Sequence, residues 1–389
     1  MNNYYVDLHI HLGRTKTGKP VKITGARSLT LENILEEATE VKGMDMIGVI
    51  DCHVPEVLDE LEQLIKEGIV FQYEDGGMRF KDVTLILGSE IEIYDEKCRG
   101  PIHVLAYLPT IEKMREFSRW LAARMKNITL SSQRIYEQGI VLQQTVKDLS
   151  GLFIPAHVFT PYKSLYGKGV KSTLSEVFNP KQIDAIELGL SSNTKMADHI
   201  QELHSYTFVT NSDAHSLAKI AREYQQIRME QPTFEELRKA LHQQSGRQIV
   251  ANYGLDPLLG KYHKTTCEGC EKVIEDMVQE RCPYCGNQKF VKGVYNRIME
   301  LGNEESKSPS NRAPYIHQVP LEFIPGLGPK TLKKLRDYFK TEMSIIHDAP
   351  ESAIKELLPQ KIAEAIILAR EGKLTLQSGG GGVYGKVKK

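Results

Sequence analysis

The sequence has no long apolar run and no excess of charge of either sign. Its 389 residues include 50 lysines and arginines and 50 aspartates and glutamates, so the formal net charge is zero. A balanced chain is not a polycation, and any nucleic-acid surface must be confined to one part of it. No stretch approaches the roughly 20 apolar residues that a membrane span needs, and no signal peptide is apparent. These absences predict a cytoplasmic protein with no membrane partner.

Cysteine is scarce, and its distribution argues against disulfides. Four of the six cysteines form two Cys-x-x-Cys pairs, Cys267 with Cys270 and Cys282 with Cys285. Four thiolates at this spacing are typical of a closed, tetrahedral structural zinc site. Such a site replaces the core in a module too small to have one. We therefore predict one structural zinc ion in a module that spans residues 256–302.

Residues 1–255 alternate short apolar runs with helical patterns. Strands that alternate with helices are typical of a parallel α/β barrel or a doubly wound sheet. The predicted strands cover residues 5–11, 46–51, 85–93, 102–108, 152–157, 183–188 and 208–213. The predicted helices cover residues 29–42, 55–67, 111–126, 130–149 and 233–244.

Histidines and carboxylates recur at the ends of these predicted strands. Side chains alternate along a strand, so Asp7, His9 and His11 point to the same face of the first one. In a barrel, the carboxyl ends of the strands share one face, which carries the chemistry. Imidazoles and carboxylates gathered there predict a metal centre. Further candidates at the later strands are Asp51, His53, Glu90, His103, His157, Asp213 and His215.

A glycine turn followed by a helical pattern marks the C-terminal part, beyond a polar linker at residues 303–318. The free N–H groups at a helix N-terminus, together with the helix dipole, favour a phosphate. The pattern resembles a helix-hairpin-helix element, which binds the backbone of DNA without recognising its sequence. A hairpin for protein contacts is the alternative. The candidate DNA-binding residues are Gly326, Gly328, Lys330, Thr331, Lys333 and Lys334, in an all-α domain at residues 319–376.

A degenerate copy of this element follows at residues 357–366. It lacks the glycines, so it is expected to serve as a packing partner. The glycine-rich and basic tail, residues 377–389, is predicted to be flexible. The sequence leaves open whether this tail docks on a replication clamp.

The motif set as a whole resembles that of PHP (polymerase and histidinol phosphatase) domains. A PHP barrel, a four-cysteine module and a helix-hairpin-helix, in that order, resemble the endonuclease Q family. The resemblance implies a distorted (β/α)7 barrel with two or three divalent metals, zinc with or without magnesium or manganese. The motifs that carry it are His9-x-His11, Asp51-Cys52-His53, Glu90, His103, His157 and Asp213-x-His215.

The resemblance also implies a role for each ligand. The first metal, with the catalytic ligands, would be held by His9, His11, Glu90 and Asp213. Glu90 would bridge to a second metal on His103 and His157, and His53 and His215 would contribute to a third. PHP domains often have another histidine shortly after the first motif, and this chain has none at residues 13–17, which weakens the third site. Asp51 is expected as a ligand or as the partner that orients His53, and Asp7 as a supporting carboxylate.

The implied activity is cleavage of DNA on the 5′ side of deaminated bases (uracil, hypoxanthine, xanthine) and of abasic sites. A damaged base must leave the stack to be recognised, which calls for aromatic and basic contacts. Two alternatives stay open: a small-molecule phosphoesterase of the histidinol-phosphatase type, and a non-catalytic DNA-binding or polymerase-accessory protein. The candidate base and phosphate contacts are Tyr94, Phe159, Tyr162, Tyr166, Lys163, Lys168 and Lys171.

Overall fold

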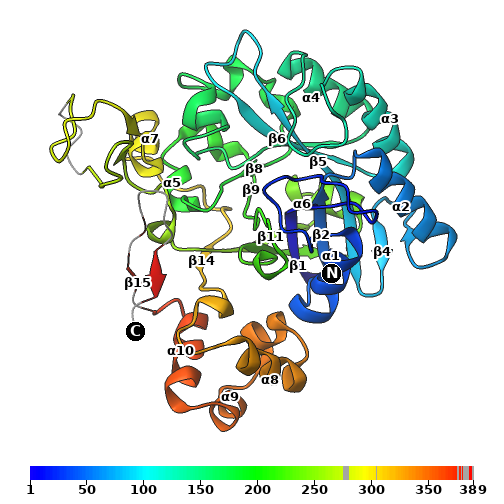
Figure 1. Ribbon diagram of the computed structural model, residues 1–389, viewed down its shortest axis with the longest axis vertical. Helices are drawn as coiled ribbons and strands as arrows, with labels where there is room; N and C mark the ends of the chain where they lie inside the picture. The colour runs from blue at the N-terminus through cyan, green and yellow to red at the C-terminus, as the bar shows by residue number, and fades with distance from the viewer. Residues whose placement is uncertain (275–279, 304, 375, 378, 380–384, 388–389) are drawn as a thin grey trace.

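Seven strands form a closed ring at the centre of the molecule, and the other elements are arranged around it (Figure 1). The computed structural model describes residues 1–274, 280–303, 305–374, 376–377, 379 and 385–387. The ring strands are β1 (Asn2–His11), β2 (Met46–Ile50), β5 (Val83–Ile93), β6 (Ile102–Leu108), β7 (Leu152–Pro155), β8 (Ile186–Glu187) and β9 (Phe208–Val209). Each of them lies within or overlaps one of the seven predicted strands, so the α/β barrel class is confirmed.

The ring closes through backbone hydrogen bonds at two places outside the regular ladders. Ladders connect β1 to β2, β2 to β5, β5 to β6 and β6 to β7, and a separate ladder connects β8 to β9. The amide of Asp184 donates to Phe153 O (3.0 Å), which joins β8 to β7. The amide of His11 donates to Ala214 O (3.1 Å), which joins the end of β9 to β1.

One ring strand runs against the parallel order that the sequence predicted. Strand β6 is antiparallel to both β5 and β7, whereas the β1–β2, β2–β5 and β8–β9 pairs are parallel. Only residues 94–101 join β5 to β6. A parallel return needs a crossover of about a dozen residues or more, so this short connection permits only a hairpin.

Further strands extend the sheet on both sides of the ring. Strand β10 (Tyr224–Met229) pairs with β1, and β11 (Gln248–Gly254) pairs with β10. Strands β4 (Met78–Phe80) and β3 (Phe71–Gln72) continue from β5. Strand β14 (Tyr315–His317) lies in the predicted linker, but it pairs with β11 and covers that edge of the sheet.

Helices cover the ring through their apolar faces. Thr110 starts one of them by accepting a hydrogen bond from the amide of Lys113 (3.3 Å). Helix α4 starts at Gly139, nine residues later than predicted, because the preceding residues form turns and an isolated bridge from Arg134 to Glu92 of β5. The helices are α1 (Leu31–Glu36), α2 (Pro55–Lys66), α3 (Ile111–Ala122), α4 (Gly139–Asp148), α5 (Thr194–Ala197) and α6 (Phe234–Leu241).

The cysteine-rich segment forms a small unit with little core of its own. It contains β12 (Thr266–Cys267) and β13 (Phe290–Val291), which pair, and then α7 (Val294–Leu301). Its own buried cluster consists of Cys267, Ile274 and Cys282. Helix α7 instead buries Val294 and Ile298 in the main core, which attaches the unit to the barrel.

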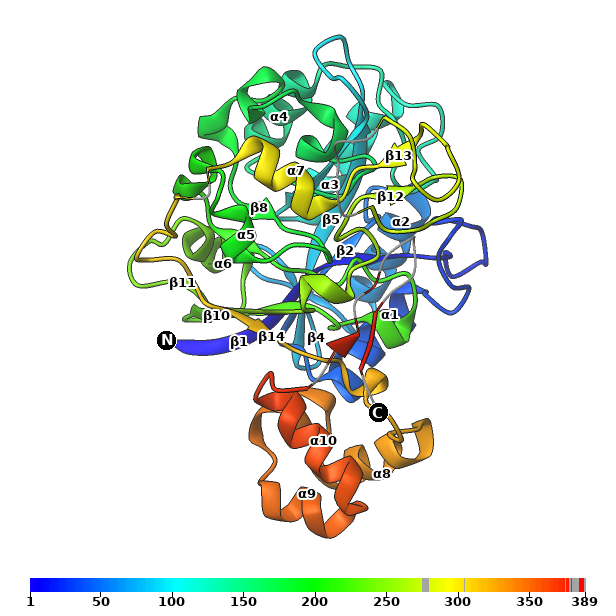
Figure 2. The same cartoon turned by 90° about the vertical axis from the view of Figure 1, so that its left-hand side faces the viewer.

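The C-terminal helices lie at one end of the molecule in both views (Figures 1 and 2). They are α8 (Pro329–Phe339), α9 (Glu351–Leu357) and α10 (Gln360–Arg370), and they share a separate hydrophobic core. The unit docks on the barrel through a buried ion pair between Lys42 Nζ and Glu342 Oε2 (2.9 Å). The ring of His347 also stacks on Tyr5, with 4.5 Å between the ring centroids. These contacts tie the helices to strand β1 through Tyr5 and to the end of the helical segment after α1 through Lys42.

Some described residues of the tail, which was predicted to be flexible, make backbone hydrogen bonds. Strands β15 (Leu376–Gln377) and β16 (Lys386–Val387) pair, and the amide of Gly379 donates to Leu258 O (2.7 Å). Residues 378, 380–384 and 388–389 lie outside the described residues. Docking of the tail on a replication clamp stays a prediction. In the described ranges, no helix has the length and apolar character to cross a membrane.

Candidate metal centre

Seven predicted ligands gather at one end of the ring in three overlapping groups. Within each group, the donor atoms all lie within 4.8 Å of one another. Glu90 belongs to two groups and His11 to two, so the three form one continuous cluster. The groups are His9, His11 and Glu90; His11, Asp213 and His215; and Glu90, His103 and His157.

The reversed strand explains how His103 reaches this cluster. His9 and His11 lie at the carboxyl end of β1, and Glu90 lies near the carboxyl end of β5. Because β6 runs back along β5, the start of β6 lies beside the end of β5. His103 Nδ1 is therefore 2.8 Å from Glu90 Oε1. His157, just after β7, places Nε2 3.2 Å from the same oxygen.

Two carboxylates behind the histidines fix which ring nitrogens face the cluster. His9 Nδ1 lies 2.9 Å from Glu187 Oε1, and His11 Nδ1 lies 3.3 Å from Asp51 Oδ2. Each carboxylate accepts the Nδ1 proton, which leaves the lone pair of Nε2 directed inward. The two Nε2 atoms are 3.3 Å apart. Two facing lone pairs repel unless a cation lies between them, so the site fits a divalent metal.

Asp213 completes this arrangement from a strained backbone. Its Oδ1 lies 3.4 Å from His11 Nε2 and 3.6 Å from His9 Nε2. Asp213 and His157 both have positive φ angles, 45° and 30°, which cost energy in non-glycine residues. Hydrogen bonds hold this turn: Asp7 accepts from the amide of Ser212 (3.1 Å), and Arg222 donates to Asp213 O (3.2 Å). Asp7 thus supports the ligand turn.

The surroundings of both central carboxylates favour their ionised form. Burial opposes the ionisation of Glu90, but the charges of His103 and Lys22 outweigh it and hold the pKa of Glu90 well below its usual value. Burial also opposes the ionisation of Asp213. The neighbouring imidazoles of His11, His9 and His215 nevertheless hold the pKa of Asp213 well below its usual value. Anionic carboxylates among imidazoles form a donor set that attracts divalent cations.

The structure does not bring His53 into any metal-binding group of described residues. Its Nδ1 lies 2.9 Å from Ser89 Oγ, and burial lowers the pKa of its ring. Asp51 orients His11 and also accepts a hydrogen bond from the amide of Leu12 (2.9 Å), so it does not orient His53. Of the two histidines expected at the third metal, His215 lies beside His11 and Asp213, whereas His53 does not.

Sequence analysis missed two charged residues of the site. Glu187 orients His9 and lies in β8, where a carboxylate inside an otherwise apolar run is a usable signal. Lys22 comes from the loop after β1 and carries no such signal. Its Nζ lies 2.6 Å from Ser132 Oγ and 3.3 Å from both Glu90 Oε2 and His11 Nε2. Lys22 thus places a positive charge beside two of the ligands.

Open space adjoins the ligands on two sides. A cavity of about 400 Å³ contains Glu90, His103, His157, Asp213 and His215 in its lining. A second cavity of about 180 Å³ shares His157 and Asp213 with it. Among the aromatic candidates, Phe159 and Tyr166 are buried core residues. Tyr94 and Tyr162 are exposed, and only they have faces available for stacking. Lys163 is paired with Glu92, whereas Lys168 lies over the ring of Tyr162.

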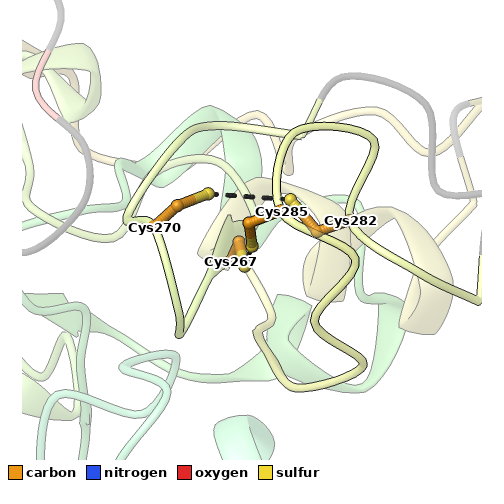
Figure 3. Close-up of side chains that lie close together, drawn as sticks. All are labelled: Cys267, Cys270, Cys282 and Cys285. Carbon is orange, nitrogen blue, oxygen red and sulfur yellow. Dashed lines mark hydrogen bonds between the residues drawn. The ribbon is translucent and has the colours of Figure 1, made fainter.

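The four paired cysteines converge from two turns of the zinc-module segment (Figure 3). Cys270 Sγ lies 3.6 Å from Cys282 Sγ, and Cys267 Sγ lies 3.5 Å from Cys285 Sγ. All four sulfurs lie within 4.8 Å of one another, and none forms a disulfide. This is the donor set of a tetrahedral zinc site. Cys52, by contrast, is buried, and burial raises the pKa of its thiol to about 12, as suits a packing residue.

Known proteins resemble this chain over its whole length. The uncharacterised protein YqxK of Bacillus subtilis is 56% identical and is covered completely, as is this chain. The crystal structure of the lesion-specific endonuclease PfuEndoQ from Pyrococcus furiosus is 32% identical, with a TM-score of 0.84, and the match covers 100% of this chain and 95% of that one. Endonuclease Q in complex with a 27-mer duplex that has an abasic lesion at the active site is also 32% identical, with a TM-score of 0.83 and coverage of 100% and 96%. No family model matches the sequence.

The barrel and its cluster of histidines and carboxylates define a metal-dependent hydrolase of the PHP class. The 32% sequence identity to the two endonuclease Q structures, over nearly the whole of both chains, identifies the family within that class. The chain belongs to the endonuclease Q family and is a metal-dependent endonuclease.

Replacing Glu187 by glutamine should weaken metal binding at the centre about 10- to 100-fold, because residues that orient a ligand have effects of that size. The amide has no negative charge to fix the Nδ1 proton of His9. Zinc titration against a chelating dye would measure the change. Glu236→Gln, at a buried carboxylate paired with Arg247, is the matched control and should bind metal normally. Equal affinity in both variants would contradict the role given to Glu187.

Proposed function

We propose that this enzyme hydrolyses the phosphodiester bond on the 5′ side of deaminated bases (uracil, hypoxanthine, xanthine) and of abasic sites in DNA. The single observation that carries the proposal is the set of three donor groups joined by Glu90 and His11 at the wall of an open cavity. The likeness to endonuclease Q supports the choice of substrate, since one of those structures holds a duplex with an abasic lesion.

Divalent metals held by these groups would supply an activated water and neutralise charge on the phosphate. The chain's own residues do the rest. Lys22 adds an ammonium close to Glu90 and His11, where it can attract a phosphate oxygen. The two carboxylates behind His9 and His11 keep the rings in place while the charge changes. Cleavage of the bond to the 3′ oxygen leaves a 3′-hydroxyl and a 5′-phosphate.

We assign two or three divalent ions to the centre, zinc with or without magnesium or manganese. The first would be held by His9, His11, Glu90 and Asp213, and the second by Glu90, His103 and His157. A third would use His215 with His11 and Asp213. The four cysteines would hold one structural zinc ion, which suits the reducing cytoplasm where thiols persist.

An extruded base would fit the cavity of about 180 Å³ beside the metal centre. Its lining includes Ser191 and Asn211, which offer hydrogen bonds, and Tyr262, which offers an aromatic face. Gly189 borders His157 so closely that an added Cβ would lie 2.9 Å from the histidine Cβ. A flipped base in this cavity would place its 5′ phosphate next to His157 and Asp213.

The turn before α8 is the proposed contact with the duplex backbone. Gly326 has a φ of 85°, which favours glycine, and a Cβ on Gly328 would meet no atom within 4 Å. The start of the helix therefore faces open space, where a phosphate can approach the backbone amides. Lys330 is exposed beside this turn. At the second copy, Pro359 takes the place of the glycines, and α10 packs into the shared core.

Replacing Lys330 by glutamate should weaken duplex binding equally for all sequences and reduce the salt slope by about one, as expected when one phosphate contact is lost. Fluorescence anisotropy at several salt concentrations would measure both quantities. Lys355→Glu on α9 is the charge-matched control, and Lys355 is paired with Glu351. If Lys330→Glu and Lys355→Glu behave alike, the turn before α8 is not the duplex contact.

The deciding experiment uses labelled duplexes that contain uracil, hypoxanthine, xanthine or an abasic site, with an undamaged duplex as control. Each is incubated with the enzyme, with and without added zinc, magnesium or manganese. We expect metal-dependent cleavage immediately 5′ of each lesion and none of the undamaged duplex. Intact strands throughout, together with turnover of a phosphomonoester such as histidinol phosphate, would instead establish the small-molecule alternative.

A further inference from the structure

An arginine between two exposed tyrosines lies next to the metal centre and is not used in the proposed mechanism. The guanidinium carbon of Arg134 lies 4.8 Å from the ring centroid of Tyr94 and 5.5 Å from that of Tyr136. The exposed fractions of the two tyrosines are 40% and 56%. All three residues line a cavity of about 610 Å³. We call Tyr94, Arg134 and Tyr136 the aromatic platform.

The platform is built onto the same strand end as the metal ligand Glu90. The amide of Glu92 donates to Gln133 O (3.1 Å), and the amide of Ile135 donates to Glu92 O (3.0 Å). Ser132, two residues before Arg134, donates a short hydrogen bond to Glu90. Arg134 also donates to Tyr94 O (2.5 Å). The segment that closes one wall of the metal cavity thus continues directly into the platform.

Charges around the platform favour a base over a phosphate. Asp95 accepts hydrogen bonds from the amides of Gly139 and Lys97 (2.8 and 2.9 Å). Glu96 and Glu137 also line the cavity. These carboxylates would repel a phosphate placed among them. In the part of the chain that the structure describes, Arg134 is exposed and has no carboxylate partner, so its charge stays with the two tyrosine rings that it contacts.

We propose that the aromatic platform binds an unpaired nucleobase of the DNA next to the extruded lesion. Aromatic rings and arginine planes stack on any base, which suits contact with a neighbour whose identity varies. Extrusion of a lesion leaves adjacent and opposite bases without a stacking partner. The platform adjoins the loop between β5 and β6, at the end of the molecule opposite to α8–α10 (Figures 1 and 2). The DNA would therefore be held on both sides of the metal centre.

This inference rests on the proposed function, and its test uses a signal that does not require cutting. The probe is 2-aminopurine, whose fluorescence falls on stacking, placed beside or opposite an abasic site in a duplex. Mixing with the full-length, metal-loaded enzyme should quench the signal before the strand is cut. Tyr94→Ala and Tyr136→Ala should remove the quenching and weaken binding of the lesion duplex about 5- to 100-fold, in line with the loss of one stacked base. Arg134→Lys should do the same in part.

Conservative and distant variants keep the test decisive. Tyr94→Phe retains the ring and should quench as the wild type does. Phe71→Ala removes another exposed ring, 62% exposed on β3 and outside the cavity lining, and should have no effect. Unchanged quenching in Tyr94→Ala and Tyr136→Ala, with lesions still cut by the wild type, would overturn the platform alone. Platform-dependent quenching by a wild-type enzyme that cuts no lesion would overturn the proposed function alone.

Discussion

Replacing Glu90 by glutamine should lower the rate of strand cleavage roughly a thousand-fold while leaving duplex affinity within about two-fold. Glu90 belongs to two of the three donor groups, so its loss affects more than one metal position. Stabilisation of phosphate charge by metals is worth several kcal/mol, and each 1.36 kcal/mol is a factor of ten in rate. Glutamine has nearly the same shape but carries no charge. Single-turnover cleavage and anisotropy would separate the rate from the affinity.

Two controls decide whether that loss reflects the metals. Glu236→Gln removes another buried carboxylate, which is paired with Arg247 away from the cavity, and should cut normally. Metal analysis of the Glu90→Gln protein should show less metal at the centre, with the thermal unfolding midpoint close to that of the wild type in the presence of EDTA. Cleavage within ten-fold of the wild-type rate would contradict the assignment of Glu90 as the shared ligand.

Replacing Cys267 and Cys282 together by serine should unfold the zinc-module segment locally and release one zinc ion per chain. Both side chains belong to the small buried cluster of this segment, which has little other core. Structural zinc contributes about 10–16 kcal/mol to the folding of zinc-finger peptides, far more than such a cluster can supply. Hydrogen exchange should rise across the described residues 263–274 and 280–293, and metal analysis should show the loss of zinc.

Helix α7 limits how far this unfolding spreads. Val294 and Ile298 lie in the main core, and Arg297 donates to Tyr166 O (2.8 Å), so exchange in the barrel should not change. Cys98→Ser is the matched control, because this thiol lies beside Asp95 and outside the four-cysteine group. Normal zinc content in the double variant would show that the four thiolates do not hold a metal together.

The ring strands were predictable because each lies in a buried, mostly apolar stretch, although β8 and β9 are only two residues long. The direction of β6 was not, since periodicity describes which side chains are buried and not how strands pair. His103 illustrates the consequence: it starts its strand, yet it lies at the carboxyl end of β5. The predicted helix at residues 130–149 was too long because tertiary contacts, which periodicity does not describe, also decide where this helix begins. Its first residues make backbone bonds to Glu92 that no local pattern encodes.

Most of the candidate ligands could be found from the sequence, because each stands beside an apolar run. The orienting carboxylate of His9 could have been found in the same way, since Glu187 interrupts such a run. Lys22 could not, because it comes from an irregular loop whose path depends on tertiary contacts. The sequence also could not show that Asp51 pairs with His11 and not with its neighbour His53, because that pairing depends on how β1 lies beside β2.

The junction between the barrel and the C-terminal helices fixes the distance between the metal centre and the proposed duplex contact before α8. The chain reaches those helices through β14, which is hydrogen-bonded into the sheet, and the Lys42–Glu342 pair holds them in place. A flexible tether would let the helices search along DNA arms of many lengths. A rigid attachment permits only one distance between the metal centre and the duplex contact. Duplexes trimmed below that distance on one arm would therefore lose this contact abruptly, and the minimum arm length would measure the distance directly.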